Sequence, residues 1–140
     1  KELDHRSGMA NSYHNIGNIH KLRGKHDTAL VMYRKSLTFY KELGDMRGVG
    51  GVYNNIGLIH QERGEYDEAL AMYQKSLVLF RELGDRKGMA GSYGNIGLIH
   101  EQSGEQSKAK SFWLKAMKIF QELGATKEAE LAQSWIDDLE

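Results

Sequence analysis

Two residue types with useful side-chain chemistry recur along this chain at a spacing of 40 residues. One set is asparagine and the other is histidine: Asn15, Asn55 and Asn95, then His20, His60 and His100. A primary amide offers both a hydrogen-bond donor and an acceptor, so a row of asparagines could hold a peptide main chain whatever its sequence. Imidazole is a common metal ligand, so the histidines raise the separate question of a metal site.

The spacing of the histidines argues against a shared metal ion. Packed helices lie about 8–10 Å apart, whereas each ligand of a zinc ion lies about 2 Å from it. Equivalent histidines of successive repeats therefore cannot meet at one ion, and we expect them to serve in packing. The remaining histidines fall outside the repeat pattern and are expected to be exposed: His5, His14 and His26.

No other arrangement of residues suggests catalysis or a cofactor. The sequence pairs no nucleophile with a base, and its glycines recur at a period of 40 instead of clustering after a strand as in a phosphate-binding loop. It has no cysteine, which excludes disulfides and thiolate metal sites and weakly favours a reducing compartment. We therefore expect no enzyme activity, no cofactor and no metal, and a cytoplasmic location.

The charge balance and the lengths of the apolar runs give no reason to expect two classes of partner. The 140 residues include 19 Lys and Arg and 19 Asp and Glu, so the formal net charge is zero, and the two halves of the chain are nearly balanced. A basic arm suited to nucleic acid is absent. No apolar run approaches the roughly 20 residues of a membrane span. Neither nucleic acid nor a membrane is an expected partner.

Each 40-residue period predicts a pair of helices. In the first copy, apolar and aromatic residues from Gly8 to His20 recur at spacings of three and four, which is typical of an amphipathic helix ending near Gly24. A second helix follows and reaches Leu43. An acidic or hydroxyl side chain near its start could serve as an N-cap or a first-turn residue. In the three copies this residue is Asp27, Asp67 and Ser107.

Glycines mark both the ends and the crossings of these helices. Gly44 can supply the left-handed residue that ends a helix, and Asp45 can cap the next one. Glycine in the middle of a helix costs about 1 kcal/mol against alanine. We therefore expect a paired helix to approach closely at each mid-helix glycine, at the alanines of the second helices: Gly17 with Ala29, Gly57 with Ala69, and Gly97 with Ala109. Glycines at the starts of later first helices, such as Gly48 and Gly88, indicate either weak ends or close contacts with the preceding helix.

The register divides the chain, which we expect to be one domain of residues 1–140, into five segments. They are the tail of a preceding repeat (1–6), repeat 1 (7–46), repeat 2 (47–86), repeat 3 (87–125) and a capping helix (126–140). The last segment aligns with a first helix. Its Asp137 and Asp138 would supply the polar outer face that a terminal helix requires.

This pattern resembles the tetratricopeptide repeat. The family's sequence of aromatic, Leu-Gly, Ala and aromatic residues is matched in the first copy at Tyr13, Ile16-Gly17, Ala29 and Tyr33, and again in the later copies. The resemblance implies an all-α fold, an α-α superhelix of three helix-turn-helix repeats plus a C-terminal capping helix. The period is 40 instead of 34, which is similar to regulators of heterotrimeric G proteins that orient the mitotic spindle, kinesin light chains and many prokaryotic arrays.

The resemblance also implies a binding groove, because first helices line the concave face in this family. The residues that would form its floor are Asn11, Asn15, Asn18, Asn55, Leu58, Asn95, Leu98 and Gln102. Some members, including a protein O-linked sugar transferase, hold a peptide backbone with an asparagine ladder at the sites of Asn15, Asn55 and Asn95. The family's carboxylate clamp is broken here, because His14, Gly91 and Asn95 occupy sites of its basic residues.

The expected function is a protein-protein interaction scaffold that binds an extended peptide segment of another protein through the asparagine ladder. Several alternatives remain. The asparagines could satisfy local backbone, and Trp135, aligned with Asn95, could either wall the groove or pack the capping helix. The fragment could self-associate, head-to-tail or by domain exchange, through an open N-terminal end at Lys1 to Leu3. It could also be the regulatory module of a larger enzyme.

Overall fold

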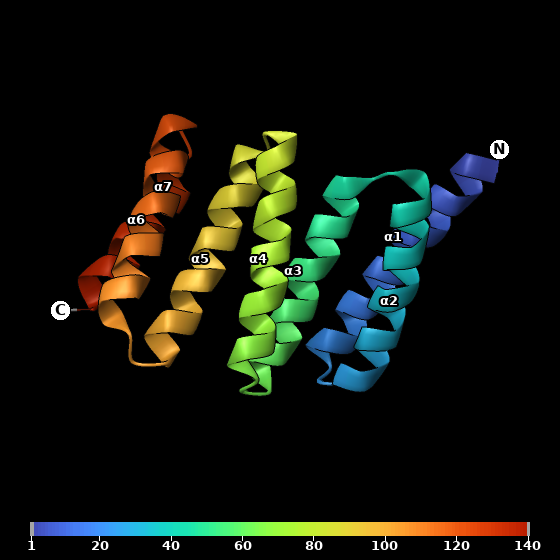
Figure 1. The fold of residues 1–140 in the computed structure, drawn as a ribbon, viewed down its shortest axis with the longest axis horizontal. Coiled ribbons are helices and arrows are strands. Elements are labelled where there is room, and N and C mark those ends of the chain that lie inside the picture. The colour runs from blue at the N-terminus through green and yellow to red at the C-terminus, as the bar shows by residue number, and fades with distance from the viewer. Residues whose placement is uncertain (1, 140) are drawn as a thin grey trace. The chain divides into compact units, whose positions relative to one another are not determined.

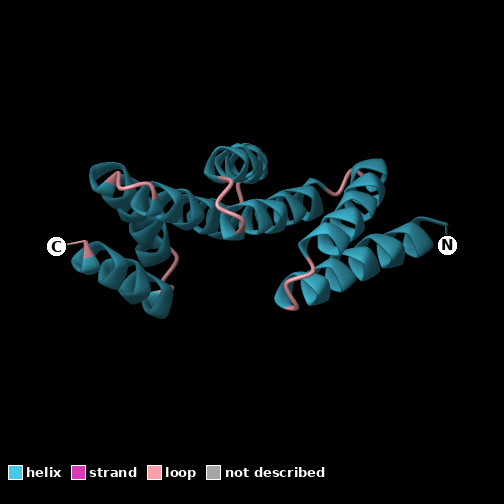
Figure 2. Cartoon of the chain, turned by 90° about the horizontal axis from the view of Figure 1, so that it is seen from below, coloured by secondary structure: helices cyan, strands magenta, loops and turns pink. Residues whose placement is uncertain are grey.

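The computed structural model describes residues 2–139, and the regular structure in that range is entirely helical (Figure 1). The helices are α1 (Glu2–Leu22), α2 (His26–Leu43), α3 (Met46–Glu62), α4 (Tyr66–Leu83), α5 (Arg86–Gln102), α6 (Gln106–Glu122) and α7 (Thr126–Asp138). Short loops join consecutive helices (Figure 2). The expected all-α class is confirmed, and α2, α4 and α6 begin at intervals of 40 residues.

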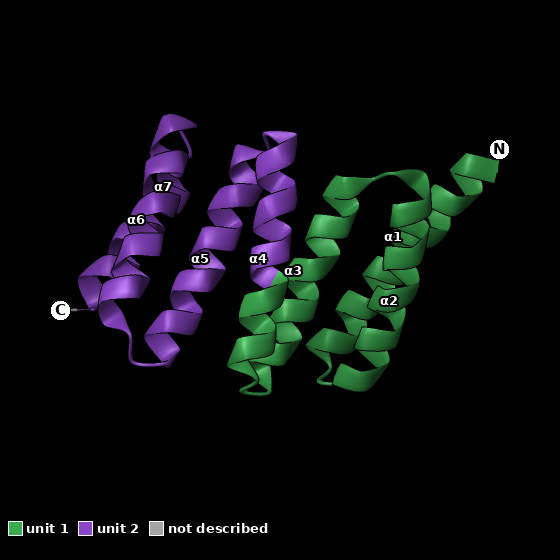
Figure 3. Ribbon diagram, viewed as in Figure 1, with its two compact units in different colours: residues 1–72 green, residues 73–140 purple. Residues whose placement is uncertain are grey.

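The chain forms two compact units, residues 1–72 and residues 73–140, and the boundary lies inside α4 (Figure 3). In unit 1, α1 packs against α2 and α2 packs against α3. In unit 2, α5 packs against α6 and α6 packs against α7. The repeat bounds predicted from the sequence remain a prediction, since no finding here tests them.

Left-handed glycines end the first six helices at intervals of 20 residues. They have φ between 68° and 79°: Gly24, Gly44, Gly64, Gly84, Gly104 and Gly124. After α2, the Gly44 amide donates to the Lys41 carbonyl (3.1 Å) and the Asp45 amide donates to the Tyr40 carbonyl (2.9 Å). These bonds close the helix around a residue whose φ only glycine adopts without steric cost. The predicted role of Gly44 is confirmed.

The helix starts are capped in two different ways. The Asp45 carboxylate accepts a hydrogen bond from the Gly48 amide at 2.9 Å, as predicted, and Asp85 does the same for Gly88. The N-cap of α2 is Lys25, which makes no capping bond, and Asp27 lies in the first turn. Of the two predicted roles for Asp27, the first-turn acid is therefore correct, and it interacts favourably with the positive end of the helix dipole.

The N-terminal end differs from the other helix junctions. Asp4 stands where Gly44 and Gly84 stand one and two periods later, and α1 runs without a break from Glu2 to Leu22. No left-handed residue is available to end a helix at this point. Residues 2–6, expected to be the tail of a preceding repeat, therefore extend α1, and Lys1 lies outside the described residues.

The mid-helix glycines allow an aromatic ring to lie against the helix backbone. A Cβ atom at Gly17 would lie 2.6 Å from Cε1 of Tyr33, and one at Gly97 would lie 2.5 Å from Cδ1 of Trp113. Both rings are buried. The predicted close approach is correct in kind, but the prediction that Ala29 and Ala109 make it is wrong. The second helix lies near enough for its next large side chain, one turn further on, to fill the space that glycine leaves.

Two further glycines accommodate the preceding helix. A Cβ atom at Gly48 would lie 2.5 Å from Cδ1 of Tyr40, and one at Gly88 would lie 2.6 Å from Cδ1 of Phe80. Close contact is therefore the correct alternative at these two positions. By contrast, a Cβ atom at Gly91 would meet nothing within 4 Å.

The last helix completes the core of unit 2. Ala129, Ala132 and Ile136 of α7 are buried. Ala129 joins a cluster with residues of α5 and α6, and Ile136 packs with Trp113. None of the helices in residues 2–139 is long and apolar enough to cross a membrane.

We predict that Gly17→Ala destabilises the protein by about 1–3 kcal/mol, because the added methyl group overlaps the buried Tyr33 ring. This loss should exceed the gain of about 1 kcal/mol in helix propensity. Urea denaturation followed by circular dichroism measures the difference. Gly8→Ala is the matched control, since Gly8 lies in the same helix with nothing within 4 Å of its Cβ position, and it should be neutral or stabilising. Equal effects would contradict the assigned contact.

Candidate ligand-binding face

The asparagines near the ends of the predicted row in α1 are bonded to tyrosines of α2. The Tyr40 hydroxyl donates to Oδ1 of Asn11 and the Tyr33 hydroxyl donates to Oδ1 of Asn18, both at 2.6 Å. Burial, with a smaller contribution from Glu62, raises the pKa of Tyr33 to about 12, so this hydroxyl stays a donor. The acceptor atoms of Asn11 and Asn18 are thus occupied within the protein.

Asn55 of α3 is bonded across to α1. Its Nδ2 lies 2.8 Å from Nε2 of His14, and its Oδ1 accepts a bond from Nζ of Lys21 at 3.4 Å. Burial and then the charge of Lys21 lower the pKa of His14, which favours the neutral ring that can accept from the amide. His14 packs edge-on against two rings, Tyr33 at 5.9 Å and Tyr40 at 6.1 Å between centroids.

Asn15 differs from Asn55 in the hydrogen bonding of its side chain. Its side chain is exposed and forms no hydrogen bond with any residue in the range that the structure describes. In unit 1, therefore, only one of the two predicted ladder asparagines has a free amide. Leu58 of α3, also predicted for the binding face, is half-buried.

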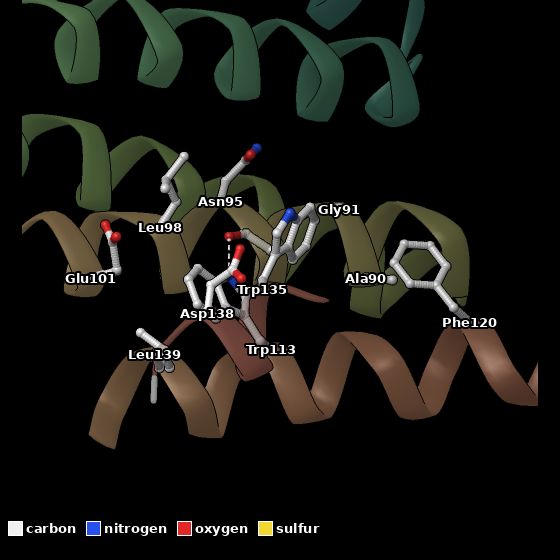
Figure 4. A pocket seen from close by; sticks show the side chains of 11 residues that line it. Ala90, Gly91, Asn95, Leu98, Glu101, Trp113, Phe120, Trp135, Asp138 and Leu139 are labelled. Atoms are coloured by element: carbon white, nitrogen blue, oxygen red, sulfur yellow. Dashed lines mark hydrogen bonds between the residues drawn. The ribbon is translucent and has the colours of Figure 1, made fainter. Parts of the chain in front are cut away.

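Unit 2 has a pocket of about 380 Å³ on the same face of its first helices (Figure 4). The lining residues come from α5, α6 and the end of α7: Ala90, Gly91, Gly94, Asn95, Leu98, Glu101, Trp113, Phe120, Trp135, Asp138 and Leu139. Asn95 and Leu98 were predicted for the binding face. Gln102, also predicted, is exposed at the end of α5 and does not line the pocket.

The pocket exists because small or apolar residues replace the polar network of unit 1. Two periods of 40 residues separate Asn11 from Gly91, His14 from Gly94, and Asn18 from Leu98, so the members of each pair occupy equivalent positions. On the second helices, Phe120 is equivalent to Tyr40 and Trp113 is equivalent to Tyr33 at the same separation. Both hydroxyl donors and both of their amide acceptors are thus lost together, so this exchange leaves neither a donor nor an acceptor of the network without its partner.

Trp135 forms one wall of this pocket. Its ring centroid lies 5.7 Å from that of Trp113, and its Cζ3 would lie 3.5 Å from a Cβ atom at Gly94. Trp113 donates from Nε1 to the Gly94 carbonyl at 3.0 Å, whereas Trp135 is half-buried. Both predicted roles of Trp135 are therefore compatible, because the ring packs with Trp113 and also lines the pocket.

Among the described residues, those that bring charge to the pocket lining are acidic. Glu101 and Asp138 carry carboxylates, and neither forms an ion pair with another described residue. Asp138, expected on a polar outer face of the capping helix, is exposed, and the last turn of α7 also makes it part of the pocket lining with Asn95 and Leu98. The sequence does carry a signal for Glu101, which follows Leu98 at helical spacing and so shares its face.

The recurring histidines are half-buried and two of them are bonded to a glutamate five residues on. His60 Nδ1 lies 3.1 Å from Oε1 of Glu65, and His100 Nδ1 lies 3.1 Å from Oε1 of Glu105. Bonds from Lys108 and then from His100 lower the pKa of Glu105. Lys25 occupies the equivalent position in the first copy, which leaves Nδ1 of His20 buried without a partner. Within residues 2–139 no three His, Asp or Glu side chains are grouped to hold a metal ion.

The histidines outside the repeat pattern do not all follow the expectation. His5 is exposed, as predicted. His14 and His26 are half-buried, so the expectation is wrong for both, because each contacts a neighbouring helix. Nε2 of His26 lies 2.9 Å from Oε2 of Glu62 in α3.

Consecutive helix pairs of one period, with left-handed glycines between helices, define an α-α solenoid repeat protein. Models of the tetratricopeptide repeat match residues 9–43 and 49–133. The chain therefore belongs to the tetratricopeptide repeat family. No curated protein sequence gives a significant match.

Solved structures with this fold share little sequence with the chain. A signal transduction ATPase with numerous domains and a tetratricopeptide repeat sensor, from Pyrococcus horikoshii, has a TM-score of 0.85 at 20% identity over 96% of this chain and 21% of that one. The repeat domain of FLU from Arabidopsis has a TM-score of 0.75 at 18% identity over 83% and 98%. BtubC from P. vanneervenii has a TM-score of 0.69 at 16% identity, over 93% of this chain and 62% of that one.

We predict that Lys25→Glu stabilises the protein by about 0.5–1.5 kcal/mol, because it supplies the missing acceptor for His20. The backbone suits this change, since Lys25 (φ −87°, ψ 71°) and Glu105 (φ −96°, ψ 69°) have similar conformations. Urea denaturation measures the gain. A carboxylate before α2 also interacts with the helix dipole, so the control is the same change in a His20→Tyr background. An equal gain there would exclude the proposed bond.

Proposed function

We propose that this chain binds an extended peptide segment of another protein on the face formed by its first helices. Its family is one of protein-interaction modules in general. The observation that supports the finer proposal is the pocket of unit 2, where the Asn95 amide, unbonded within the described part of the chain, stands beside the apolar Leu98 and Trp135. An amide can bond a main chain while the apolar wall receives a side chain.

The three asparagines of the proposed ladder should contribute unequally. The amides of Asn15 and Asn95 form no hydrogen bond within the described residues, so a ligand can bond them without breaking an internal bond. Asn55 is bonded to His14 and Lys21, so a ligand can use it only in exchange for one of those bonds. We also propose, from the 40-residue period, membership of the extended repeat type, and, from the absence of cysteine, a cytoplasmic location.

We predict that Asn95→Ala weakens peptide binding about two- to thirteenfold, which corresponds to about 0.5–1.5 kcal/mol for one hydrogen bond. The ligand is a nine-residue peptide selected from a random library against the protein, and calorimetric titration measures the affinity. Asn15→Ala should have a similar effect and Asn55→Ala a smaller one. The melting temperatures of Asn95→Ala and Asn15→Ala should hardly fall, because neither change breaks a hydrogen bond within the described residues and alanine is the better helix former.

Gln121→Ala is the matched control, since it removes an exposed amide from α6 outside the pocket. It should leave the affinity unchanged. If Asn95→Ala binds as well as the wild type, or loses helicity instead of affinity, the asparagines are structural and the ladder is wrong.

A second candidate function is self-association through α1. Ile16 and Ile19 are 39% and 48% exposed, whereas their equivalents in the later copies are buried, at 7% and 0% and then 1% and 2%: Ile56, Ile59, Ile96 and Ile99. Leu3 and Leu22 of α1 are also exposed. A second copy of the chain that covered this face would remove apolar surface from water. The alternative of a regulatory module is supported by the likeness to the sensor-bearing ATPase, of which this chain spans 21%.

We predict a mass that rises with protein concentration for the wild type and stays at the monomer value for Ile16→Ser with Ile19→Ser. Each isoleucine contributes about 1.5–3 kcal/mol when fully buried, so dissociation should become at least about tenfold easier. Sedimentation equilibrium measures the mass. Val31→Ser, which changes an exposed apolar residue of α2, should associate as the wild type does. A wild type that remains monomeric at all concentrations would remove this candidate.

A further inference from the structure

We propose that the pocket of unit 2 is a site for an arginine side chain of the bound peptide. This inference rests on the proposed peptide-binding function and specifies the partner's chemistry. The pocket combines two features: an aromatic wall of Trp135 and Trp113, and two carboxylates, Glu101 and Asp138, with no basic residue among the described residues of its lining (Figure 4).

The first argument is charge complementarity. Glu101 and Asp138 make no ion pair with another described residue, so their negative charge is uncompensated at the site. Both belong to the last turn of a helix, α5 for Glu101 and α7 for Asp138. The carbonyl groups at the end of a helix carry a further partial negative charge. Four sources of negative potential therefore act on one pocket, and a cation is favoured over an anion.

The second argument is the wall of the pocket. The face of a tryptophan ring carries negative charge and attracts a cation placed over it. Trp135 is half-buried, and its ring packs against Trp113 and lies close to Gly94. Leu98 and Leu139 add apolar surface for the methylene groups of a long side chain.

The third argument distinguishes arginine from lysine. A guanidinium group is planar, stacks on an aromatic face and is more weakly hydrated than an ammonium group. Its several N–H donors can serve two carboxylates at the same time. A lysine ammonium is a strongly hydrated point charge, and its removal from water into an aromatic pocket costs more. The combination of the Trp135 ring with two carboxylates in the lining therefore favours arginine.

The experiment compares capped nine-residue peptides that differ at the central residue only: arginine, citrulline, lysine or glutamate, with alanine and serine elsewhere. Citrulline has nearly the shape of arginine but no charge. Affinities are measured by nitrogen-15 NMR titration, followed at the indole N–H groups of Trp113 and Trp135 and the amide of Asn95. Arginine should bind about tenfold more tightly than citrulline, which corresponds to about 1.4 kcal/mol, and glutamate most weakly.

The carboxylates are tested by Glu101→Gln with Asp138→Asn, which should abolish the preference for arginine over citrulline. Both residues are exposed, so folding should be retained. Glu130→Gln is the matched control, because it removes an exposed carboxylate of α7 that does not line the pocket, and the preference should persist. The preference in the wild type should also diminish as salt is added.

The outcomes separate this inference from the function on which it rests. If arginine and citrulline bind equally while Asn95→Ala weakens both, the arginine site is wrong and peptide binding stands. A preference for glutamate overturns the arginine site in the same way. If none of the four peptides shifts the pocket resonances, peptide binding on this face of unit 2 is wrong as well.

Discussion

The contact on which both units depend is an aromatic ring of a second helix lying against the backbone of a first helix. Glycine is required at Gly17 and Gly97, because any side chain would overlap Tyr33 or Trp113. The buried ring then needs a partner for its polar atom, so the same contact determines the neighbouring polar residues. Tyr33 requires Asn18, whereas Trp113 uses the backbone carbonyl of Gly94. The packing of the core and the polarity of the face formed by the first helices are therefore linked.

This link explains why two units built from the same repeated helix pair present different surfaces. In unit 1 the two tyrosine hydroxyls occupy Asn11 and Asn18, and His14 occupies Asn55, so the face is largely satisfied internally. In unit 2 the hydroxyls are absent, and Gly91 and Leu98 stand where acceptors are no longer needed. The volume left open becomes the pocket, and Trp135 of α7 closes one side of it. A helix that completes the core thus also contributes to the candidate site.

Much of the fold could be predicted because its determinants are local. The left-handed glycine at Gly44 and the cap at Asp45 depend on a few neighbouring residues, and the 40-residue period repeats the same signals. The prediction failed where a long side chain decided the contact: Tyr33, not Ala29, meets Gly17. Asp4 stands where later repeats have a helix-ending glycine. The chain therefore has no signal to end a helix there, and α1 continues unbroken through this position.

The sequence by itself determined the helices, their ends, their family and the residues that share the first-helix face, because periodicity and turn chemistry act over a few residues. Only the tertiary structure decided which of those residues are bonded within the protein. Asn15, Asn55 and Asn95 are equivalent in the sequence, yet Asn55 is bonded to His14 and Lys21, and Asn95 lines a pocket with Trp135. The same holds for Asp138, which joins this pocket although it is 43 residues from Asn95. Whether a polar group is available depends on what lies opposite it in space, and this is set by packing between helices.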